Sequence, residues 1–458
     1  MTGMIQRGRE LFARALPHPS LAKDVLRLAT PVTLGMLTFT LLSIVDTAML
    51  GHLGAVPLAA AGVAGVLFFA VVFPISSMSV GTQTLVARRF GEGNMHECGA
   101  VLNTGMVLSL AIGLTLLVTA SWLTAIIAPM TSNDFQVREA GAVYLYYRLL
   151  GAPFMLLNAI GLGFFAGIGK TKHQLIGSLC ITATNIVLDY WLIYGKAGFP
   201  RLEVQGAAIA SSIALGVGTI YYLLILALPG YRRIYGTFRS PWFASRWLRP
   251  MLRLSSPILA QRILANGAWA VFFLIVARIG TVELAATNVI RSIYHLSIMI
   301  AIGLGVASAA LIGQNLGANN PDKAERLAWE SVKLATYAMI VIGLLFLVVP
   351  GAVFRIYTAD PLVISTGRLA LMLLGLVQIF AGVALVLSQS LQGAGNTRYV
   401  MMAEVACVVL YLPTVYVLGR HTSLGLIGAW TGEYVYWIVL SAAMVVKFRT
   451  GSWKTIKL

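Results

Sequence analysis

The sequence predicts an all-α polytopic membrane protein with twelve transmembrane helices in two six-helix halves. Three observations predict this fold class: an apolar composition, a regular succession of long apolar runs, and an internal repeat. Of the 458 residues, 58% are hydrophobic and only 11% are charged. Soluble domains of any size are much more polar than this. The chain is therefore expected to lie in a lipid bilayer.

Twelve apolar runs are long enough to cross a membrane as helices. A hydrocarbon core of ~30 Å requires about 20 helical residues, because an α-helix rises ~1.5 Å per residue. The predicted spans are residues 29–51, 58–81, 100–128, 140–162, 172–194, 205–229, 255–279, 284–311, 328–350, 363–391, 398–419 and 426–446. An even number of spans returns the chain to the side on which it starts.

The basic residues predict the orientation of these spans. The net charge is +17, but Lys and Arg occur in short segments between apolar runs, so nucleic acid is not an expected partner. With a cytoplasmic amino terminus, 22 of them fall on the cytoplasmic side and 7 on the opposite side. Because cytoplasmic loops carry the excess of Lys and Arg, both termini are expected in the cytoplasm and the protein in the inner or plasma membrane. The run after Arg7, Arg9 and Arg14 is too long for a signal peptide, so it is expected to be retained as the first helix.

Cysteine and histidine residues do not predict a metal centre or an enzyme. The three cysteines, Cys98, Cys180 and Cys407, are scattered singly, which excludes a disulfide framework and a metal cluster. A membrane-embedded enzyme requires a convergent His, Asp or Glu constellation at one face. The histidines are dispersed along the chain and do not supply one. No cofactor is expected.

The one long connection, residues 230–254, is predicted to be a basic cytoplasmic linker between the halves. It contains six arginines, with Trp242, Phe243 and Trp247 among them. Aromatic and basic side chains together are typical of a segment at the lipid headgroups. A substrate-sensing role is the alternative.

The two halves are copies of one another. With a constant offset of 226 residues, residues 26–94 align with 252–320 without a gap, so that Pro31 pairs with Pro257 and Gly54 with Gly280. Six spans per half give both halves the same orientation, so the repeat axis is predicted to lie along the membrane normal, with a substrate cavity between the halves. The predicted domains are residues 1–229, the linker 230–254, and residues 255–458.

The first span contains a single carboxylate, Asp46. An ionisable side chain within a membrane costs roughly 2.5–3.5 kcal/mol on insertion scales, so it usually marks an ion or substrate pathway. Asp46 lies only five residues before Gly51, however, so it is also placed to reach the outer headgroups. Pro31, near the start of the same run, removes a backbone hydrogen bond and weakens the helix where bending is useful.

A comparison of the two halves favours the functional interpretation of Asp46. Its counterpart at the repeat offset is Phe272, and a second acid, Asp189, pairs with Val415. Both acids therefore belong to the first half, on helices that run in the same direction, and each lies about five residues before the outer end. Asn185 is one turn before Asp189 on the same helix face, so it is placed to share a hydrogen-bond network with that carboxylate.

Other charges inside predicted spans are weaker signals. Glu404 and Glu433 fall in the last two spans, and Arg148, Arg262 and Arg291 fall in spans four, seven and eight. They either pair across the second half or line a polar route, but each taken singly is interpreted as a packed or snorkelling group.

These features together resemble the multidrug and toxic compound extrusion (MATE) family over essentially the whole chain. The resemblance rests on two like-oriented halves, Val45-Asp46-Thr47, and the junction Gly167-Ile168-Gly169-Lys170-Thr171 with its echo at residues 392–397. Asn185 and Asp189 match the pattern of the DinF-like branch. The NorM-like branch carries acids in helices seven and ten, where this chain has Asn266, Gln378 and Ala381.

The resemblance implies an antiporter that expels amphipathic, often cationic compounds as protons or sodium ions enter. It further implies a first-half network of Asp46, Asn185 and Asp189 with Ser211 and Tyr144, and a helix bend at Pro31. Protons are favoured over sodium, although Asp46, Asp189 and Asn185 also offer oxygen ligands for Na⁺. We expect a monomer. The alternative is a flippase for a lipid-linked precursor, for which a cationic cluster in the cavity is expected.

Overall fold

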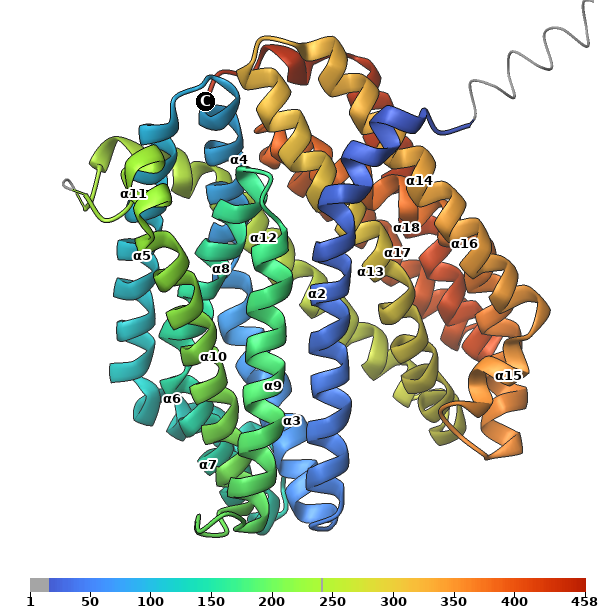
Figure 1. Ribbon diagram of the computed structural model, residues 1–458. Helices are drawn as coiled ribbons and strands as arrows, with labels where there is room; N and C mark the ends of the chain where they lie inside the picture. Colours follow the sequence, from blue (N-terminus) through green and yellow to red (C-terminus); the bar gives the residue numbers. More distant parts are fainter. Residues whose placement is uncertain (1–15, 240–241) are drawn as a thin grey trace, which may run out of the picture. The chain divides into compact units, whose positions relative to one another are not determined.

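The structure is a computed structural model that describes residues 16–239 and 242–458 (Figure 1). The predicted all-α fold class is confirmed: the described residues form helices and contain no β-strand. The basic residues Arg7, Arg9 and Arg14 lie outside the described residues.

Twelve membrane-spanning segments are present, as the sequence predicts. Eleven are helices long and apolar enough to cross a bilayer, with α3 and α4 counted as one span, and the twelfth is the bent pair α7 and α8. The segments are α2 (Pro19–Gly51), α3 (Ala55–Ile75) with α4 (Met78–Gly91), α5 (Met95–Val118), α7 (Phe135–Leu150) with α8 (Ala152–Gly167), α9 (Lys172–Tyr194), α10 (Glu203–Ala227), α12 (Ser245–Ala277), α13 (Thr281–Gly317), α14 (Pro321–Val348), α16 (Pro361–Gly393), α17 (Thr397–Arg420) and α18 (Gly425–Arg449).

Three predicted spans contain breaks that the apolar pattern does not predict. The third span is interrupted at Thr119, between α5 and the short helix α6 (Ala120–Ile127). The second span is interrupted between α3 and α4, directly after Pro74, and Arg262 donates hydrogen bonds there to the Phe73 carbonyl (3.0 Å) and to Ser76 Oγ (2.8 Å). Arg262 is therefore a packed group that satisfies polar atoms freed by the break. The fourth span bends by 47° between α7 and α8, where Pro153 lies in the first turn of α8.

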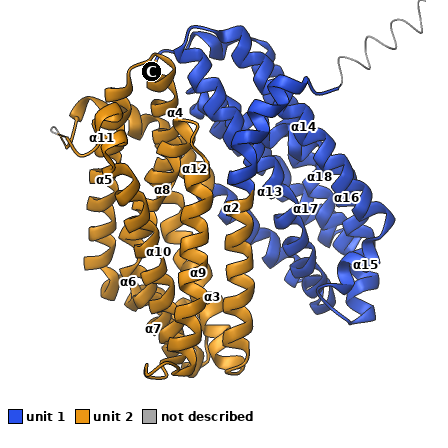
Figure 2. Ribbon diagram, viewed as in Figure 1, with its two compact units in different colours: residues 1–33, 263–457 blue, residues 34–262, 458 orange. Residues whose placement is uncertain are grey.

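The described chain forms two compact units by its internal contacts (Figure 2). One contains residues 1–33 and 263–457, and the other contains residues 34–262 with Leu458. Helices α2 and α12 each pass from one unit into the other, and the repeat-related prolines Pro31 and Pro257 lie inside these two helices. The domain division at residues 229 and 255 follows the repeat in the sequence, and it stays a prediction.

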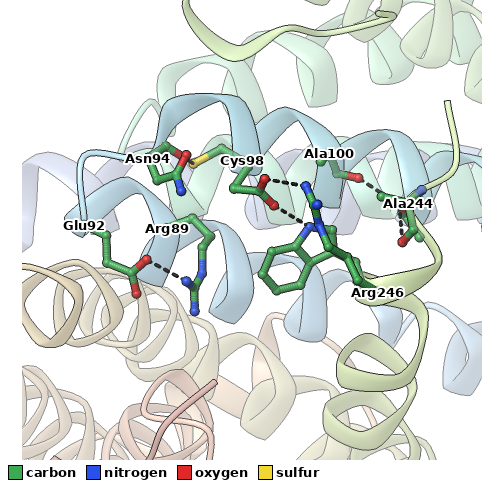
Figure 3. A network of polar contacts seen from close by, with 10 residues as sticks. Arg89, Glu92, Asn94, Cys98, Ala100, Ala244 and Arg246 are labelled. Atoms are coloured by element: carbon green, nitrogen blue, oxygen red, sulfur yellow. Dashed lines mark hydrogen bonds and ion pairs between the residues drawn. The ribbon is translucent and has the colours of Figure 1, made fainter. Parts of the chain in front are cut away.

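The linker is held against the N-terminal part of α5. It contains the short helix α11 (Pro229–Tyr235), and α12 begins ten residues before the predicted start of the seventh span. Thr104 Oγ1 accepts a hydrogen bond from the Ala244 amide at 3.1 Å (Figure 3). Glu97 pairs with Arg246 and accepts from Trp247 Nε1 at 2.8 Å. Trp247 is therefore buried in these contacts, whereas Trp242 is 56% exposed.

Small residues let helices of the residue 263–457 unit approach closely. A Cβ atom built on Gly393 of α16 would lie 2.4 Å from the carbonyl oxygen of Ala309 in α13. The neighbour is backbone, so it cannot move aside as a side-chain end would. Close approach of this kind is how apolar helices gain packing energy inside a membrane.

We predict that Gly393→Ala lowers the thermal stability of the detergent-solubilised protein. The added methyl group must displace the α13 backbone, and overpacking of this kind costs about 1–3 kcal/mol. Gly267→Ala is the matched control, because a Cβ atom there meets nothing within 4 Å. Thermal unfolding of both variants checks the prediction, and equal midpoints for the two would contradict it.

Candidate functional site

The structure brings four of the predicted site residues together in the residue 34–262 unit. Helix α2 carries Asp46, α9 carries Asn185 and Asp189, and α10 carries Ser211. Asn185 and Asp189 are fully buried, with 0% exposure, and Ser211 is 8% exposed. Asp46 is partly buried. The one-turn spacing of Asn185 and Asp189 places both on the same face of α9, as the sequence predicts.

Asn185 is the centre of this cluster. Only one orientation of its side-chain amide lets the nitrogen donate to hydrogen-bond acceptors and the oxygen accept from donors. In it, the nitrogen donates to Asp46 Oδ1 and to Asp189 Oδ2, each at 3.0 Å, and the oxygen accepts from Ser211 N (3.1 Å) and Ser211 Oγ (3.3 Å). The amide therefore bridges the two carboxyl groups, and α10 fixes its orientation.

The carboxyl groups of Asp46 and Asp189 approach one another, because both accept from the same Asn185 nitrogen. Asp189 Oδ1 is buried and has no hydrogen-bond partner among the described residues. Two like charges in a site of low dielectric repel strongly, so a proton or another cation bound to the pair relieves that repulsion.

Arg148 is a member of the site that the sequence interpretation did not single out. It lies on α7, one turn after Tyr144, and both side chains are buried. Arg148 interacts electrostatically with Asp46, Asp189 and Tyr144, and its guanidinium stacks on the Phe68 ring at 4.5 Å. Its Nε atom has no hydrogen-bond partner among the described residues. The sequence did contain a signal for this residue: Tyr144 and Arg148 are four residues apart, which places them on one face of a helix.

The repeat-related positions of the other half hold packed apolar side chains. Phe272 and Val415, which correspond to Asp46 and Asp189, are both fully buried in the hydrophobic core of their unit. Pro31 lies in the interior of α2, which is helical on both sides of it. Its missing N–H leaves the carbonyl of Arg27 without its usual helical partner. The role of Pro31 in bending stays a prediction.

An apolar hollow lies beside the C-terminal part of α2. It has a volume of about 440 Å³ and is lined by Ile44, Val45, Ala48, Met49, His52 and Tyr194. Tyr194 closes one side by donating a hydrogen bond to the Met49 carbonyl at 2.8 Å. Asp46 is flanked in sequence by these residues but is not part of the lining.

A family model described as MatE matches the chain twice. The matches cover residues 31–191 and 257–417, so the second follows the first by the same 226 residues that relate the two halves. More than half of the chain is therefore covered by this family's pattern. The internal repeat found in the sequence is confirmed by this independent match.

Curated relatives match over nearly the full length. The chain is 25% identical over 452 residues to a probable multidrug resistance protein NorM of Thermotoga maritima, covering 97% of this chain and 96% of that protein. It is 29% identical over 439 residues to the multidrug resistance protein NorM of Burkholderia vietnamiensis, covering 92% and 93%. A solved structure described as the outward-facing conformation of a multidrug resistance MATE family transporter of the MOP superfamily has the same fold, with a TM-score of 0.84, 22% identity, and coverage of 94% and 95%.

We predict that Asn185→Ala destabilises the protein more in alkaline than in acidic buffer. The lost amide donates to both carboxyl groups, and hydrogen bonds to charged groups contribute about 1.5–3 kcal/mol. In acid, both carboxyl groups are protonated and depend less on these donors, so the destabilisation is smaller there.

Thermal unfolding in the two buffers tests this expectation, with Asn158→Ala as the control. Asn158 is also a buried asparagine, but its amide donates to the Leu215 carbonyl at 3.0 Å and accepts from Thr219. Its loss is expected to be equally destabilising in both buffers. The same pH dependence in both variants would refute a specific role of Asn185 beside the carboxyl pair.

Proposed function

The chain belongs to the MatE family, and we propose that it is a proton-coupled antiporter that exports amphipathic, often cationic compounds from the cytoplasm. Its relatives are named multidrug resistance proteins, and their matches extend over almost all of both chains. The family is one of transporters rather than enzymes, as the sequence predicts. The proposal concerns the exported compounds, the coupling ion and the residues that bind it.

One observation carries the proposal: the carboxyl groups of Asp46 and Asp189 both accept from the Asn185 nitrogen, each at 3.0 Å. We propose that this pair of carboxyl groups shares a proton. Removing the shared proton leaves two charges that need a cation, and adding a proton removes that need. A site that binds either a proton or an organic cation couples their movements in opposite directions. Each charge moved across ~100 mV contributes ~2.3 kcal/mol, so the membrane potential drives the exchange.

The orientation of the Asn185 amide favours protons over sodium. A sodium ion needs several oxygen ligands around it. Asn185 turns its nitrogen toward both carboxyl groups and its oxygen toward Ser211, so it presents donors rather than a ligand to the space between Asp46 and Asp189. A proton needs one carboxyl oxygen only. Among the described residues, no group of three or more His, Cys, Asp or Glu side chains is arranged to hold a metal ion.

Arg148 supplies a resident positive charge for the exchange. Its interactions with Asp46 and Asp189 neutralise the pair in part when the proton leaves. Tyr144, one turn before it, interacts with the same three groups. An exported cation then competes with Arg148 for the carboxylates, which keeps its binding reversible. The apolar hollow beside α2 provides adjacent surface for the non-polar part of such a compound.

The topology proposed for this transporter follows from the distribution of basic residues. The charge bias places both termini in the cytoplasm and the protein in the inner or plasma membrane. The halves 1–229 and 255–458 alternate access to the two sides as a monomer, and the flexible point of the first helix is Pro31. Alternating access by rocking halves needs no cofactor.

We predict that Asp46→Asn abolishes drug efflux while the protein is still expressed and folded. Removing a charge from an apolar medium does not break packing, so only the exchange is lost. Drug accumulation in cells expressing the variant measures this. Asp134→Asn is the matched control in the same unit, because Asp134 is an exposed carboxylate that caps α7 through its side chain. Resistance retained in the Asp46→Asn cells would contradict the proposal.

The coupling ion is tested in sodium-free vesicles that contain the purified protein. An inward-driving proton gradient is expected to drive a fluorescent organic cation to the opposite side, and Asp46→Asn is expected to abolish that movement. A proton gradient suffices because the carboxyl pair needs no other ion. Transport that ignores the proton gradient and appears only after sodium is added would refute proton coupling.

A further inference from the structure

The residue 263–457 unit contains a buried carboxyl group of its own, Glu433. It lies on α18, which packs against α16 and α17, and is only 4% exposed. At the offset of 226 residues, Glu433 corresponds to Ala207, so the first half has no acid at the equivalent position. The group is far too buried to reach water by snorkelling, so the structure decides between the two sequence interpretations in favour of a packed side chain.

Three neutral hydrogen-bonding groups surround the Glu433 carboxyl. Trp437 Nε1 donates to Glu433 Oε2 at 2.8 Å. Tyr294 on α13 and Tyr411 on α17 interact electrostatically with the carboxyl. The buried Oη of Tyr294 has no hydrogen-bond partner among the described residues, so it is free to turn toward the carboxyl.

No positive charge compensates Glu433. Within the described part of the chain, no Lys, Arg or His forms an ion pair with it. Tyr436 on α18 also faces the cluster and interacts with Glu404 and Cys407 of α17. Arg291, the basic residue one turn before Tyr294, is exposed and stacks on Phe273 at 5.2 Å.

This set of donors accommodates the carboxyl group with or without a proton. Trp437 can only donate, so it fixes Oε2 as an acceptor and leaves Oε1 to carry a proton. A tyrosine hydroxyl can donate or accept, depending on its rotation. The ionised carboxylate therefore receives donors from the tyrosines, whereas the protonated carboxyl donates to one of them. Changing between the two states requires only the rotation of a hydroxyl group.

Aromatic rings pack in the surroundings of the site. Phe272 is fully buried and meets Trp430 edge to face, with ring centroids 5.2 Å apart. Trp269 packs on both Tyr294 and Trp430. These rings belong to or pack against the hydrophobic core of the unit, which suits the binding of a proton better than the binding of an organic cation.

We propose that Glu433 is a second proton-binding site of this transporter, separate from the Asp46–Asp189 pair, hydrogen-bonded by Trp437 and flanked by Tyr294 and Tyr411. The proton comes from bulk water and returns to bulk water, so no other reactant is needed. The use of this proton during export rests on the proposed function, but the binding of the proton to Glu433 does not. A protein that fails to export drugs can therefore still show protonation of Glu433, and the reverse also holds.

The test measures protonation directly in the purified protein. Infrared spectra recorded during a pH titration show the C=O stretching band of each protonated carboxyl group. Glu433→Gln is expected to remove one component of this band. Asp360→Asn is the matched control, because Asp360 is an exposed carboxylate of the same unit that caps α16. The control is expected to keep the component assigned to Glu433.

Trp437→Phe tests the site without removing the carboxyl group. The lost indole N–H favoured the ionised form, so the midpoint of the Glu433 component is expected to move to higher pH. A Glu433→Gln spectrum that matches the unmodified protein at every pH would overturn the proposal. If the Glu433→Gln variant does not fold, the proposal is overturned instead by a Trp437→Phe variant in which no C=O band component changes its titration midpoint.

Discussion

The burial of two carboxyl groups at one point of an apolar medium is the constraint on which the first unit depends. An isolated ionised carboxylate in such a medium is penalised by several kcal/mol, and a second one beside it adds repulsion. Each neighbour of Asp46 and Asp189 offsets part of the free-energy cost of these charges. Asn185 donates to both groups, Ser211 fixes the Asn185 amide, and Arg148 brings a positive charge. Removal of any of these leaves a buried charge less compensated, so the site is sensitive throughout.

The duplicated scaffold makes the chemical difference between the halves visible. The same helices recur at a constant offset, yet the positions of Asp46 and Asp189 are occupied by the buried Phe272 and Val415. A scaffold that folds with apolar residues at these positions does not need the acids for stability. This asymmetry supports the proposal that the acids serve function rather than folding.

Much of this arrangement is predictable from the sequence because membrane physics leaves few alternatives. A backbone in lipid must satisfy its own hydrogen bonds, so long apolar runs become helices, and the described residues contain the expected spans with shifted ends and local breaks. The proximity of Asp46 to Asp189 followed from equal depth on helices of one half. Arg148 was not predicted as a partner, because depth and helix face do not identify which neighbouring helix a side chain meets. The breaks at Ser76 and Gly151 were missed because the spans were placed by the length of apolar runs, although Pro74 and Pro153 lie beside the two breaks.

The two acidic sites differ in what compensates their charge, and the proposals give them different tasks for that reason. The Asp46–Asp189 pair has an arginine beside it, and in the proposed exchange this charge compensates the deprotonated state until an organic cation enters. Glu433 accepts from the neutral Trp437, which stabilises a carboxylate less than a cation does. Buried aromatic rings pack in the surroundings of Glu433, which suits a proton better than an organic cation. In these proposals, the charge of the nearest partner, more than the presence of an acid, separates a site for cation exchange from a site that only binds a proton.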